Sequence, residues 1–462
     1  MIELVKSAIN EVVFDRKDHP TVTPTKLLWD ETKKMRCLVW KGKGDIEYVE
    51  HPRPKITSPS DIILKVTATS ICGSDLHLYK GTFLGMQEGH IPGHEFLGLV
   101  YEVGSEVKTF KVGQRVIAAF CIACGECDNC NREEYTACER SNPTRTIGLA
   151  HGDRATGVYA NSHITGEVGG GQAEYVCVAE RNCYLVPDEL PDDQALYLTD
   201  IIPTGYHAAL MGDVGPNRVV GVWGLGPIGL MCARWCQILG AKRVIGIDSV
   251  PERLALAKTV LQIETIDIEE VKDVPEALDK MLEGKLDVAI DCVGFDFPKT
   301  WLHKTQMKIG METDCPELFT EMFRAVRKFG NISIAGDYYL ATNNFPIGAM
   351  MEKGLTIRGG QCPVQKYWDR CTNVLRSGTI DPLFLVTHRG TLADVNTVTK
   401  NEKQTDRGRV ARRQQWTKRM PQHRMPQTTP MCNSKPPEAI TLNSVPTRAW
   451  KRSRKLLLLL RN

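Results

Sequence analysis

Four cysteines lie close together in one short, polar segment of the chain. Cys124, Cys127, Cys130 and Cys138 follow the spacing C-x2-C-x2-C-x7-C. Four thiolates at this spacing can close a tetrahedral shell around Zn²⁺ and leave no position for a substrate. Buried free cysteines are the alternative, but glycine, acidic and amide residues separate these four. The sequence therefore predicts a structural zinc site.

A glycine-rich turn gives a second chemical signal. Gly224, Gly226 and Gly229 form G-L-G-P-I-G directly after the apolar run VVGVW. These glycines let the backbone approach a pyrophosphate, and the helix that follows would offer it free N–H groups. Asp248 ends the next apolar run, where its carboxylate can bind the ribose hydroxyls of adenosine and repel a 2′-phosphate. We predict a dinucleotide site that favours NAD over NADP.

The elements that must position these residues change character along the chain. Up to about residue 190, short strands punctuated by glycine predict a small barrel or an irregular β domain; the clearest of them lie at 35–49, 62–66, 97–103 and 115–119. From Val219 onward, apolar runs alternate with helical stretches, which is typical of βαβ units in a parallel sheet. The strands expected in this part are VVGVW, RVIGID, LDVAIDCVG and NISIAG.

Four further sequence words surround possible ligands of a catalytic metal. They are ICGSDLH from Ile71, PGHEFLG from Pro92, GGGQAEYV from Gly169 and LTDIIPTGY from Leu198. With the cysteine loop and the glycine-rich turn in the same order, the chain resembles the zinc-dependent medium-chain alcohol dehydrogenase superfamily. It is most similar to the glutathione-independent formaldehyde dehydrogenases and their alcohol dehydrogenase relatives.

The resemblance implies an α/β fold, in which a Rossmann doubly wound parallel sheet accompanies a β-rich GroES-like catalytic domain. The catalytic domain would be split in sequence around the Rossmann domain. The expected boundaries are an N-terminal extension at 1–34, the catalytic domain at 35–203, the Rossmann domain at 204–354, a return to the catalytic domain at 355–395 and a tail at 396–462 that departs from the family.

The resemblance also implies a catalytic zinc held by Cys72, His94 and Asp200. One thiolate, one carboxylate and one neutral imidazole cancel the charge of Zn²⁺, and three ligands leave a fourth position open. Glu95 matches a family glutamate that lies behind the metal and is an occasional ligand. Ser74 and His77 match a relay that carries the substrate proton towards solvent. The alternatives are that the Ser74 hydroxyl only stabilises a turn and that His77 is a surface residue.

Further cofactor contacts follow from the resemblance. The nicotinamide half would face the ends of two strands, and residues 295–314 would be a loop that wraps the cofactor, with an ordinary surface insertion as the alternative. Arg253 either lies over the adenine or ribose or is a solvated helix residue. The other expected contacts are Ile228, Val293, Gly294, Ala335 and Gly336.

The charge of the chain is divided unevenly. Over 462 residues the net charge is +3, yet residues 401–462 hold 15 Lys and Arg against three Asp and Glu. Such a basic segment can be a nucleic-acid arm. We prefer a frame change or a retained intron in the gene model, and we expect no nucleic-acid partner and no regular structure over 396–462. Its many prolines and few apolar residues favour disorder.

Composition narrows the class of protein further. Hydrophobic residues make up 42% of the chain and charged residues 24%, as in ordinary globular proteins. The longest aliphatic run, 456–460, is too short to span a bilayer. We find no secretory or mitochondrial targeting pattern at the start of the chain, and we expect a cytoplasmic protein with no membrane partner.

These signals converge on an oxidoreductase. The resemblance implies transfer of a hydride from a small alcohol or aldehyde hydrate to NAD, with two zinc ions per chain and a homo-oligomeric assembly. The altered C-terminus keeps open an alternative, a non-catalytic dinucleotide-binding sensor or interaction protein that retains the fold.

Overall fold

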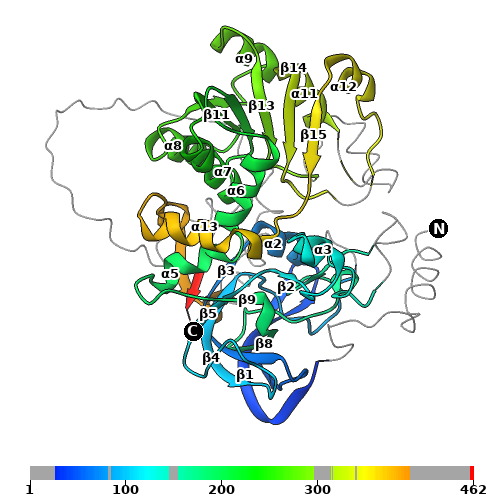
Figure 1. The fold of residues 1–462 in the computed structure, drawn as a ribbon, viewed down its shortest axis with the longest axis vertical. Coiled ribbons are helices and arrows are strands. Elements are labelled where there is room, and N and C mark those ends of the chain that lie inside the picture. Colours follow the sequence, from blue (N-terminus) through cyan, green and yellow to red (C-terminus); the bar gives the residue numbers. More distant parts are fainter. Residues whose placement is uncertain are drawn as a thin grey trace, which may run out of the picture.

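The computed structural model of the protein describes residues 27–81, 85–144, 154–295, 314, 316–338, 341–395 and 458–461. Two sheets dominate these residues. Figure 1 shows one sheet with its helices at the top and the other below, with helices α6 (Ile201–Met211) and α13 (Val364–Arg376) near their junction. The described part contains no helix with the length and apolar character needed to cross a bilayer.

The upper part is a Rossmann domain. Its six described strands are all parallel, in the order β12-β11-β10-β13-β14-β15. The strands span Val219–Trp223 (β10), Arg243–Asp248 (β11), Glu264–Asp267 (β12), Leu286–Asp291 (β13), Val326–Ile334 (β14) and Thr356–Gly359 (β15). The helices span Pro227–Ile238 (α7), Pro251–Thr259 (α8), Val274–Met281 (α9), Glu317–Ala325 (α11) and Ile347–Lys353 (α12). The expected doubly wound parallel sheet is confirmed.

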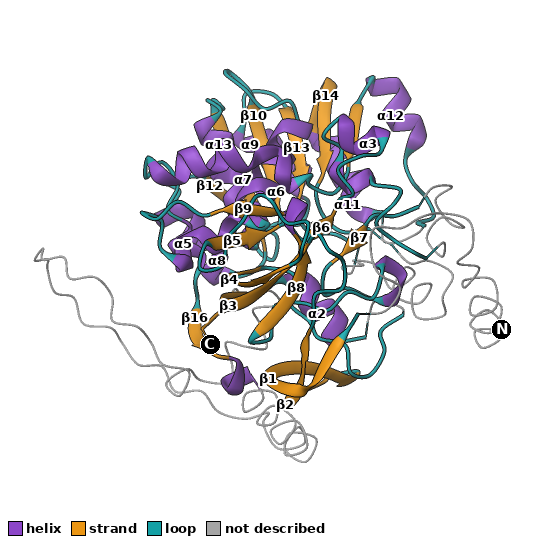
Figure 2. Cartoon of the chain, turned by 60° about the horizontal axis from the view of Figure 1, so that its bottom comes forward, coloured by secondary structure: helices purple, strands orange, loops and turns teal. Residues whose placement is uncertain are grey.

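Alternation along β10 explains why helices cover both faces. Val220 and Val222 join a core with α6, α7, α8 and α13, whereas Val219 and Trp223 pack with α9 and α11. Successive strand residues point to opposite faces, so a strand that is apolar on both faces must be buried on both. Figure 2 shows this helix-rich part beyond the strands of the second domain.

The lower part is the GroES-like catalytic domain. Its main sheet runs β16-β17-β3-β4-β5-β9, and β8 also pairs with β3. The strands span Asp61–Ile71 (β3), Phe96–Val103 (β4), Arg115–Ala118 (β5), Tyr175–Ala179 (β8), Cys183–Leu185 (β9), His388–Thr391 (β16) and Leu458–Arg461 (β17). A hairpin of β1 (Trp29–Gly42) and β2 (Asp45–Pro54) and a short pair of β6 (Cys121–Ile122) and β7 (Gly157–Val158) complete it.

The structure shifts two expected domain boundaries and corrects one expectation about the tail. Strand β1 begins at Trp29, inside the segment expected to precede the catalytic domain. Strand β15 belongs to the Rossmann sheet, although we expected residues after 354 to return to the catalytic domain. The expectation of no regular structure over 396–462 is wrong at β17, because backbone pairing with β3 and β16 satisfies N–H and C=O groups on both sides of this strand. The rest of that tail lies outside the described residues.

Candidate active site

The four residues expected around a catalytic metal lie together. Cys72 precedes helix α2 (Gly73–Tyr79), His94 and Glu95 directly precede β4, and Asp200 precedes α6. One possible ligand atom from each lies within 4.8 Å of the others. The pairing of β3 with β4 brings the first three together, and the start of α6 adds the fourth.

This set of donors suits a divalent cation. Burial raises the pKa of the Cys72 thiol to about 12, and burial beside Asp200 raises the pKa of Glu95 to about 8. Oε1 of Glu95 makes no hydrogen bond to any described residue. A Zn²⁺ ion among these groups would offset the cost of burying their negative charge and give that oxygen a partner. The residues therefore fit zinc.

His94 is held between two carboxylates. Its Nδ1 lies 3.5 Å from Oδ1 of Asp75, and its Nε2 lies 3.5 Å from Oδ2 of Asp200. The backbone N–H of Cys72 donates to Oδ2 of Asp75 at 2.8 Å. A carboxylate on one ring nitrogen fixes the orientation of the imidazole and leaves the other nitrogen for a metal. Asp75 can therefore orient both His94 and the backbone of Cys72.

The two expected relay residues occupy different surroundings. The Ser74 hydroxyl is half-buried and donates to Oδ2 of Asp337 at 3.3 Å. His77 is buried, and its ring centroid lies 5.3 Å from that of Phe295. Ser74 lines the cavity described next and His77 does not. The alternative that His77 is a surface residue is wrong, while the relay itself stays a prediction.

A cavity of about 420 Å³ connects the predicted catalytic metal site with the predicted dinucleotide site. Its walls come from the metal-site residues, the first turn of α7 and the ends of β13 and β14. Apolar side chains and polar ones, among them His207 and Asp337, form the remaining wall. The lining residues used below are Cys72, Ser74, His94, Asp200, His207, Gly226, Ile228, Ala335, Gly336 and Asp337.

The glycine-rich turn has the geometry that a cofactor phosphate requires. Gly224 has φ +86°, which favours glycine, and Gly226 caps the N-terminus of α7. A Cβ on Gly229 would lie 1.7 Å from the carbonyl oxygen of Gly224, so only glycine fits there. Gly226 and Ile228 line the cavity. The turn thus presents the start of a helix to the cavity.

Asp248 stands at the end of β11, beside this turn. Its carboxylate accepts hydrogen bonds from the backbone N–H groups of Leu225 and Ser249, each at 2.6 Å, and from that of Val250 at 2.9 Å. Nη1 of Arg253 lies 3.5 Å from its Oδ2. Arg253 therefore turns towards the predicted ribose site, and its side chain is only 17% exposed, so it is not an ordinary solvated helix residue.

The strand ends expected near the nicotinamide are held by one buried residue, Asp291. Oδ1 of Asp291 accepts from the backbone N–H groups of Val293 at 2.7 Å and Gly294 at 3.3 Å. The carbonyl of Asp291 accepts from the backbone N–H groups of Ala335 and Gly336, each at 3.0 Å. Of these four residues, Ala335 and Gly336 line the cavity, and Val293 and Gly294 do not. Most of the expected cofactor loop at 295–314 lies outside the described residues.

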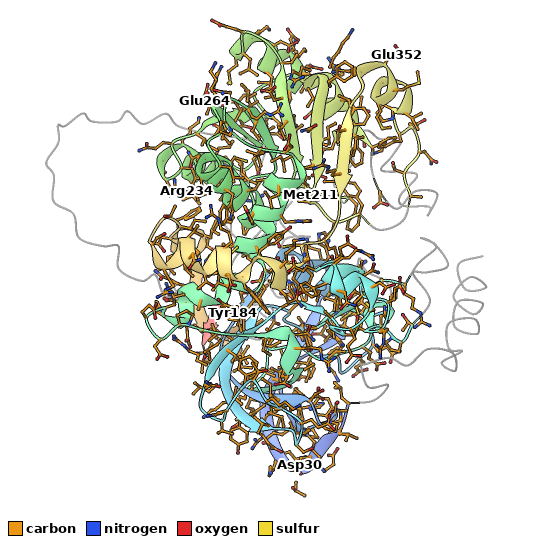
Figure 3. All side chains as sticks on the ribbon, viewed as in Figure 1. Asp30, Tyr184, Met211, Arg234, Glu264 and Glu352 are labelled. Atoms are coloured by element: carbon orange, nitrogen blue, oxygen red, sulfur yellow. The ribbon has the colours of Figure 1, made fainter. Side chains whose placement is uncertain are left out.

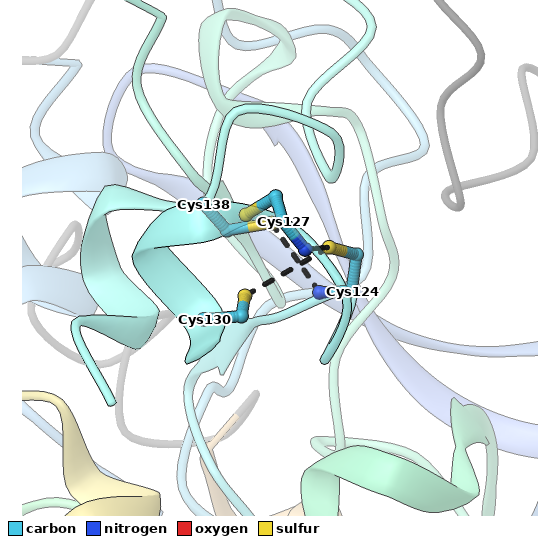
Figure 4. A group of neighbouring side chains, drawn as sticks. All are labelled: Cys124, Cys127, Cys130 and Cys138. Atoms are coloured by element: carbon cyan, nitrogen blue, oxygen red, sulfur yellow. Dashed lines mark hydrogen bonds between the residues drawn. The ribbon is translucent and has the colours of Figure 1, made fainter. Parts of the chain in front are cut away.

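The cysteine loop forms a compact set of four thiols, drawn in Figure 4. One sulfur atom from each of Cys124, Cys127, Cys130 and Cys138 lies within 4.8 Å of the others. The backbone N–H of Cys127 donates to the sulfur of Cys124 at 3.2 Å, and that of Cys124 donates to the sulfur of Cys138 at 3.3 Å. A hydrogen bond from Cys130 lowers the pKa of Cys138. These features fit a closed tetrathiolate site for zinc.

Comparisons with known proteins decide the family. Residues 58–188 match the alcohol dehydrogenase GroES-like domain, and residues 227–376 match the zinc-binding dehydrogenase domain. A zinc-type alcohol dehydrogenase-like protein of Schizosaccharomyces pombe is 43% identical over 358 residues, which cover 77% of this chain and 85% of the relative. The chain belongs to the zinc-dependent medium-chain alcohol dehydrogenase superfamily.

Other members of this superfamily agree with that assignment. The glutathione-independent formaldehyde dehydrogenase of Pseudomonas aeruginosa is 33% identical over 372 residues, covering 72% of this chain and 88% of that protein. The structure of an alcohol dehydrogenase from Thermus sp. ATN1 matches with a TM-score of 0.68 and 29% identity, covering 80% of this chain and 97% of that one. The chain is therefore a zinc-dependent alcohol dehydrogenase-like enzyme, with zinc and a nicotinamide dinucleotide as cofactors. The alternative of a non-catalytic sensor is not retained.

Three polar residues of this dehydrogenase carry geometry that sequence analysis did not assign. Gln172, from the word GGGQAEYV, donates through Nε2 to the carbonyl of Ser70 at 3.2 Å and to Oδ2 of Asp75 at 3.5 Å. Asp75 stands in the word ICGSDLH, three positions after Cys72, so its place on the first turn of a helix was a usable signal. Asp337 follows NISIAG directly, but no motif marked it.

Proposed function

We propose that this enzyme oxidises a small alcohol or an aldehyde hydrate and passes the hydride to NAD. The observation that supports this proposal most is the single cavity that joins the metal-site residues to the glycine-rich turn. A hydride can transfer only when donor and acceptor carbons approach within about 3–3.5 Å. One cavity that reaches both cofactor sites allows this approach.

Zinc, when bound by Cys72, His94 and Asp200, would act as a Lewis acid that lowers the pKa of a substrate hydroxyl. The chain itself must orient the substrate and remove its proton. The Ser74 hydroxyl lines the cavity beside Cys72, where it can accept that proton while its own passes towards His77, the next residue of the predicted relay. Apolar side chains in the cavity wall would reduce the access of water to the reacting carbon.

NAD is the cofactor that Asp248 favours in this proposal. The Asp248 carboxylate is buried at the end of β11 and lies 3.5 Å from Arg253. A 2′-phosphate placed beside it would meet a negative charge, whereas ribose hydroxyls would donate to it. The cavity volume limits the size of the substrate, because the same space of about 420 Å³ must also admit the nicotinamide ring.

The test is a substrate panel with two cofactors. Purified enzyme, loaded with zinc, is given methanol, ethanol, longer primary alcohols or formaldehyde, and the absorbance of the reduced cofactor is followed. We expect turnover with NAD on at least one member of the panel, and the C72S variant should lose it while keeping the zinc of the cysteine loop. A well-folded enzyme with two zinc ions and no turnover with any member would contradict the substrate class.

We also propose that the enzyme is a homo-oligomer. Strand β15 lies at one end of the described Rossmann sheet, where it pairs with β14 only. Nearby, Phe329, Ile347 and Met351 are 66–77% exposed, and such side chains favour burial against another chain. Sedimentation equilibrium would test this, and a monomer at micromolar concentration would contradict it.

A further inference from the structure

The cavity of this enzyme has an uneven charge. No lysine, arginine or glutamate is present among the described residues that line it. His207 is neutral at physiological pH, since burial, with Lys366 nearby, lowers its pKa to about 4. Asp200 lies with His94 and Cys72 in the metal-site cluster, where a bound zinc would balance its charge. Among the described lining residues, no cationic group therefore balances the negative charge of the Asp337 carboxylate.

The backbone fixes where Asp337 stands. It follows Gly336, and a Cβ on Gly336 would lie 2.4 Å from the backbone nitrogen of Gly294, so β13 and β14 end in close contact. The carbonyl oxygen of Asp337 accepts from the backbone N–H of Phe295 at 2.9 Å. Its side chain is exposed and accepts from the Ser74 hydroxyl at 3.3 Å. The carboxylate thus spans from the Rossmann domain to the catalytic domain.

This inference rests on the proposed function, which requires the nicotinamide ring to lie near Asp337. The glycine-rich turn would hold the pyrophosphate at one end of the cavity, and the metal ligands would hold the substrate at the other. The ring that accepts the hydride must lie between them. Ser74 lines the cavity two positions after the metal-site residue Cys72, and Asp337, which accepts from its hydroxyl, lines the cavity as well.

We propose that Asp337 recognises the oxidised nicotinamide ring as an organic cation. The ring carries a positive charge in NAD⁺ and loses it when it accepts a hydride. A fixed carboxylate beside the ring therefore stabilises the oxidised cofactor more than the reduced one. Asp337 sets the ratio of the two affinities and, in this role, binds the cofactor without taking part in bond making.

The experiment compares binding of NAD⁺ and NADH to the zinc-loaded enzyme and to the D337N variant, by calorimetry at one low ionic strength. Asparagine keeps the shape of the side chain and an acceptor for Ser74 but removes the charge. A charge pair several ångströms apart at a partly exposed site is worth about a factor of ten in affinity. We expect the Kd for NAD⁺ to rise about tenfold and the Kd for NADH to change less than about twofold.

Two further variants separate charge from structure. D337E keeps the charge and should keep the wild-type ratio of the two affinities. Glu352 lies on α12, which Figure 3 places far from the junction of the domains, and its side chain is exposed. The E352Q variant removes one negative charge from the same domain and should leave both constants unchanged.

Other outcomes would overturn the inference in distinguishable ways. Equal changes for NAD⁺ and NADH in D337N, or no change in either, would reject Asp337 as the recognition residue while leaving the proposed function intact. A D337E variant that behaves like D337N would point to shape instead of charge and would also reject it. Wild-type enzyme that binds neither form would instead reject the proposed cofactor, and the inference with it.

Discussion

Cys72 and Cys124 offer the same thiol in two different settings. Cys72 stands among one imidazole and two carboxylates beside a cavity, whereas Cys124 stands among three other thiols in a polar loop. The first setting leaves room for a substrate, and the second does not. The two residues should therefore fail in different ways when they are changed.

Removal of Cys124 should cost the enzyme one zinc ion and part of its stability. In the C124S variant we expect one zinc per chain by metal analysis, against two in the wild type, and a lower Tm because the loop loses its clamp. C72S should also hold one zinc, but with a smaller change in Tm and no activity. A wild-type enzyme that is well folded with fewer than two zinc ions would contradict the assignment.

Asp248 carries the prediction on cofactor choice. In D248S the negative charge that would repel a 2′-phosphate is gone, so discrimination against NADP should fall by roughly 10–100-fold in kcat/KM, about 1–3 kcal/mol. The variant should also be less stable, because three backbone N–H groups lose their acceptor. Steady-state kinetics with both cofactors measure the first effect. Wild type that prefers NADP would show that the role given to Asp248 is wrong.

His207 predicts how stability depends on pH. Its folded-state pKa of about 4 lies below the usual 6.5, so the unfolded chain binds the proton more tightly. The part of the free energy of unfolding that depends on a neutral His207 is fully present above pH 6.5 and is lost as pH falls towards 4. At pH 5 the loss is about 2 kcal/mol. Without cofactor, H207Q should lose less stability than wild type between pH 7 and pH 5, as measured by urea unfolding; equal losses would contradict this.

Residues of the site were predictable where a motif named them and not where only folding brings them together. The cysteine spacing and the glycine-rich turn identify their members by sequence, and the structure groups them as expected. Asp337 and Ser74 meet although 263 positions separate them. Such a pair depends on how two domains close on each other, which local patterns do not encode.

At the scale of elements, strand β3 organises the catalytic domain. One edge of it pairs with β4 over most of its length. The other edge is shared, with β8 beside Asp61–Lys65 and β17 beside Ala68–Ile71. Because Cys72 follows directly, the pairing of β17 holds the strand end that carries a predicted zinc ligand.

A proline in β17 should therefore unsettle the catalytic domain. Leu459 pairs with Ser70 of β3 on one side and Arg389 of β16 on the other. The L459P variant loses an N–H group and distorts the strand, so we expect a loss of about 3 kcal/mol in the free energy of unfolding. L459I suits a strand and should unfold as the wild type does. Identical unfolding of L459P and wild type would show that β17 does not form in solution.

The apolar pattern of the sequence predicted the central strands of the Rossmann sheet but did not predict the strands at its two edges. VVGVW and RVIGID are continuous apolar runs, as expected for strands buried on both faces, and they form β10 and β11. Strands β12 and β15 are short and polar, with sequences ETID and TIRG. They lie at the two ends of the sheet, where neighbours supply the pairing that the sequence alone does not specify.

At the scale of the whole molecule, the cavity couples ligand binding to the union of the two domains. Its walls come from both, so a dinucleotide that fills it would stabilise their closed arrangement. At about one hundred times its Kd, a ligand adds about 2.7 kcal/mol to the free energy of unfolding. We expect NAD to raise Tm more than NADP at equal concentration. Thermal unfolding with each cofactor measures this, and equal shifts would argue against a preference for NAD.

The shared edge of β3 also has a consequence for biosynthesis. Its partner β4 leaves the ribosome soon after it, but β17 is made only after the whole Rossmann domain. At a translation rate of ~5–20 residues per second, β3 waits roughly 20–80 s for that last partner. During this interval Ala68–Ile71 form an open strand edge that other nascent chains or chaperones can occupy. The segment that leads into Cys72 is therefore among the last parts of the catalytic domain to become native.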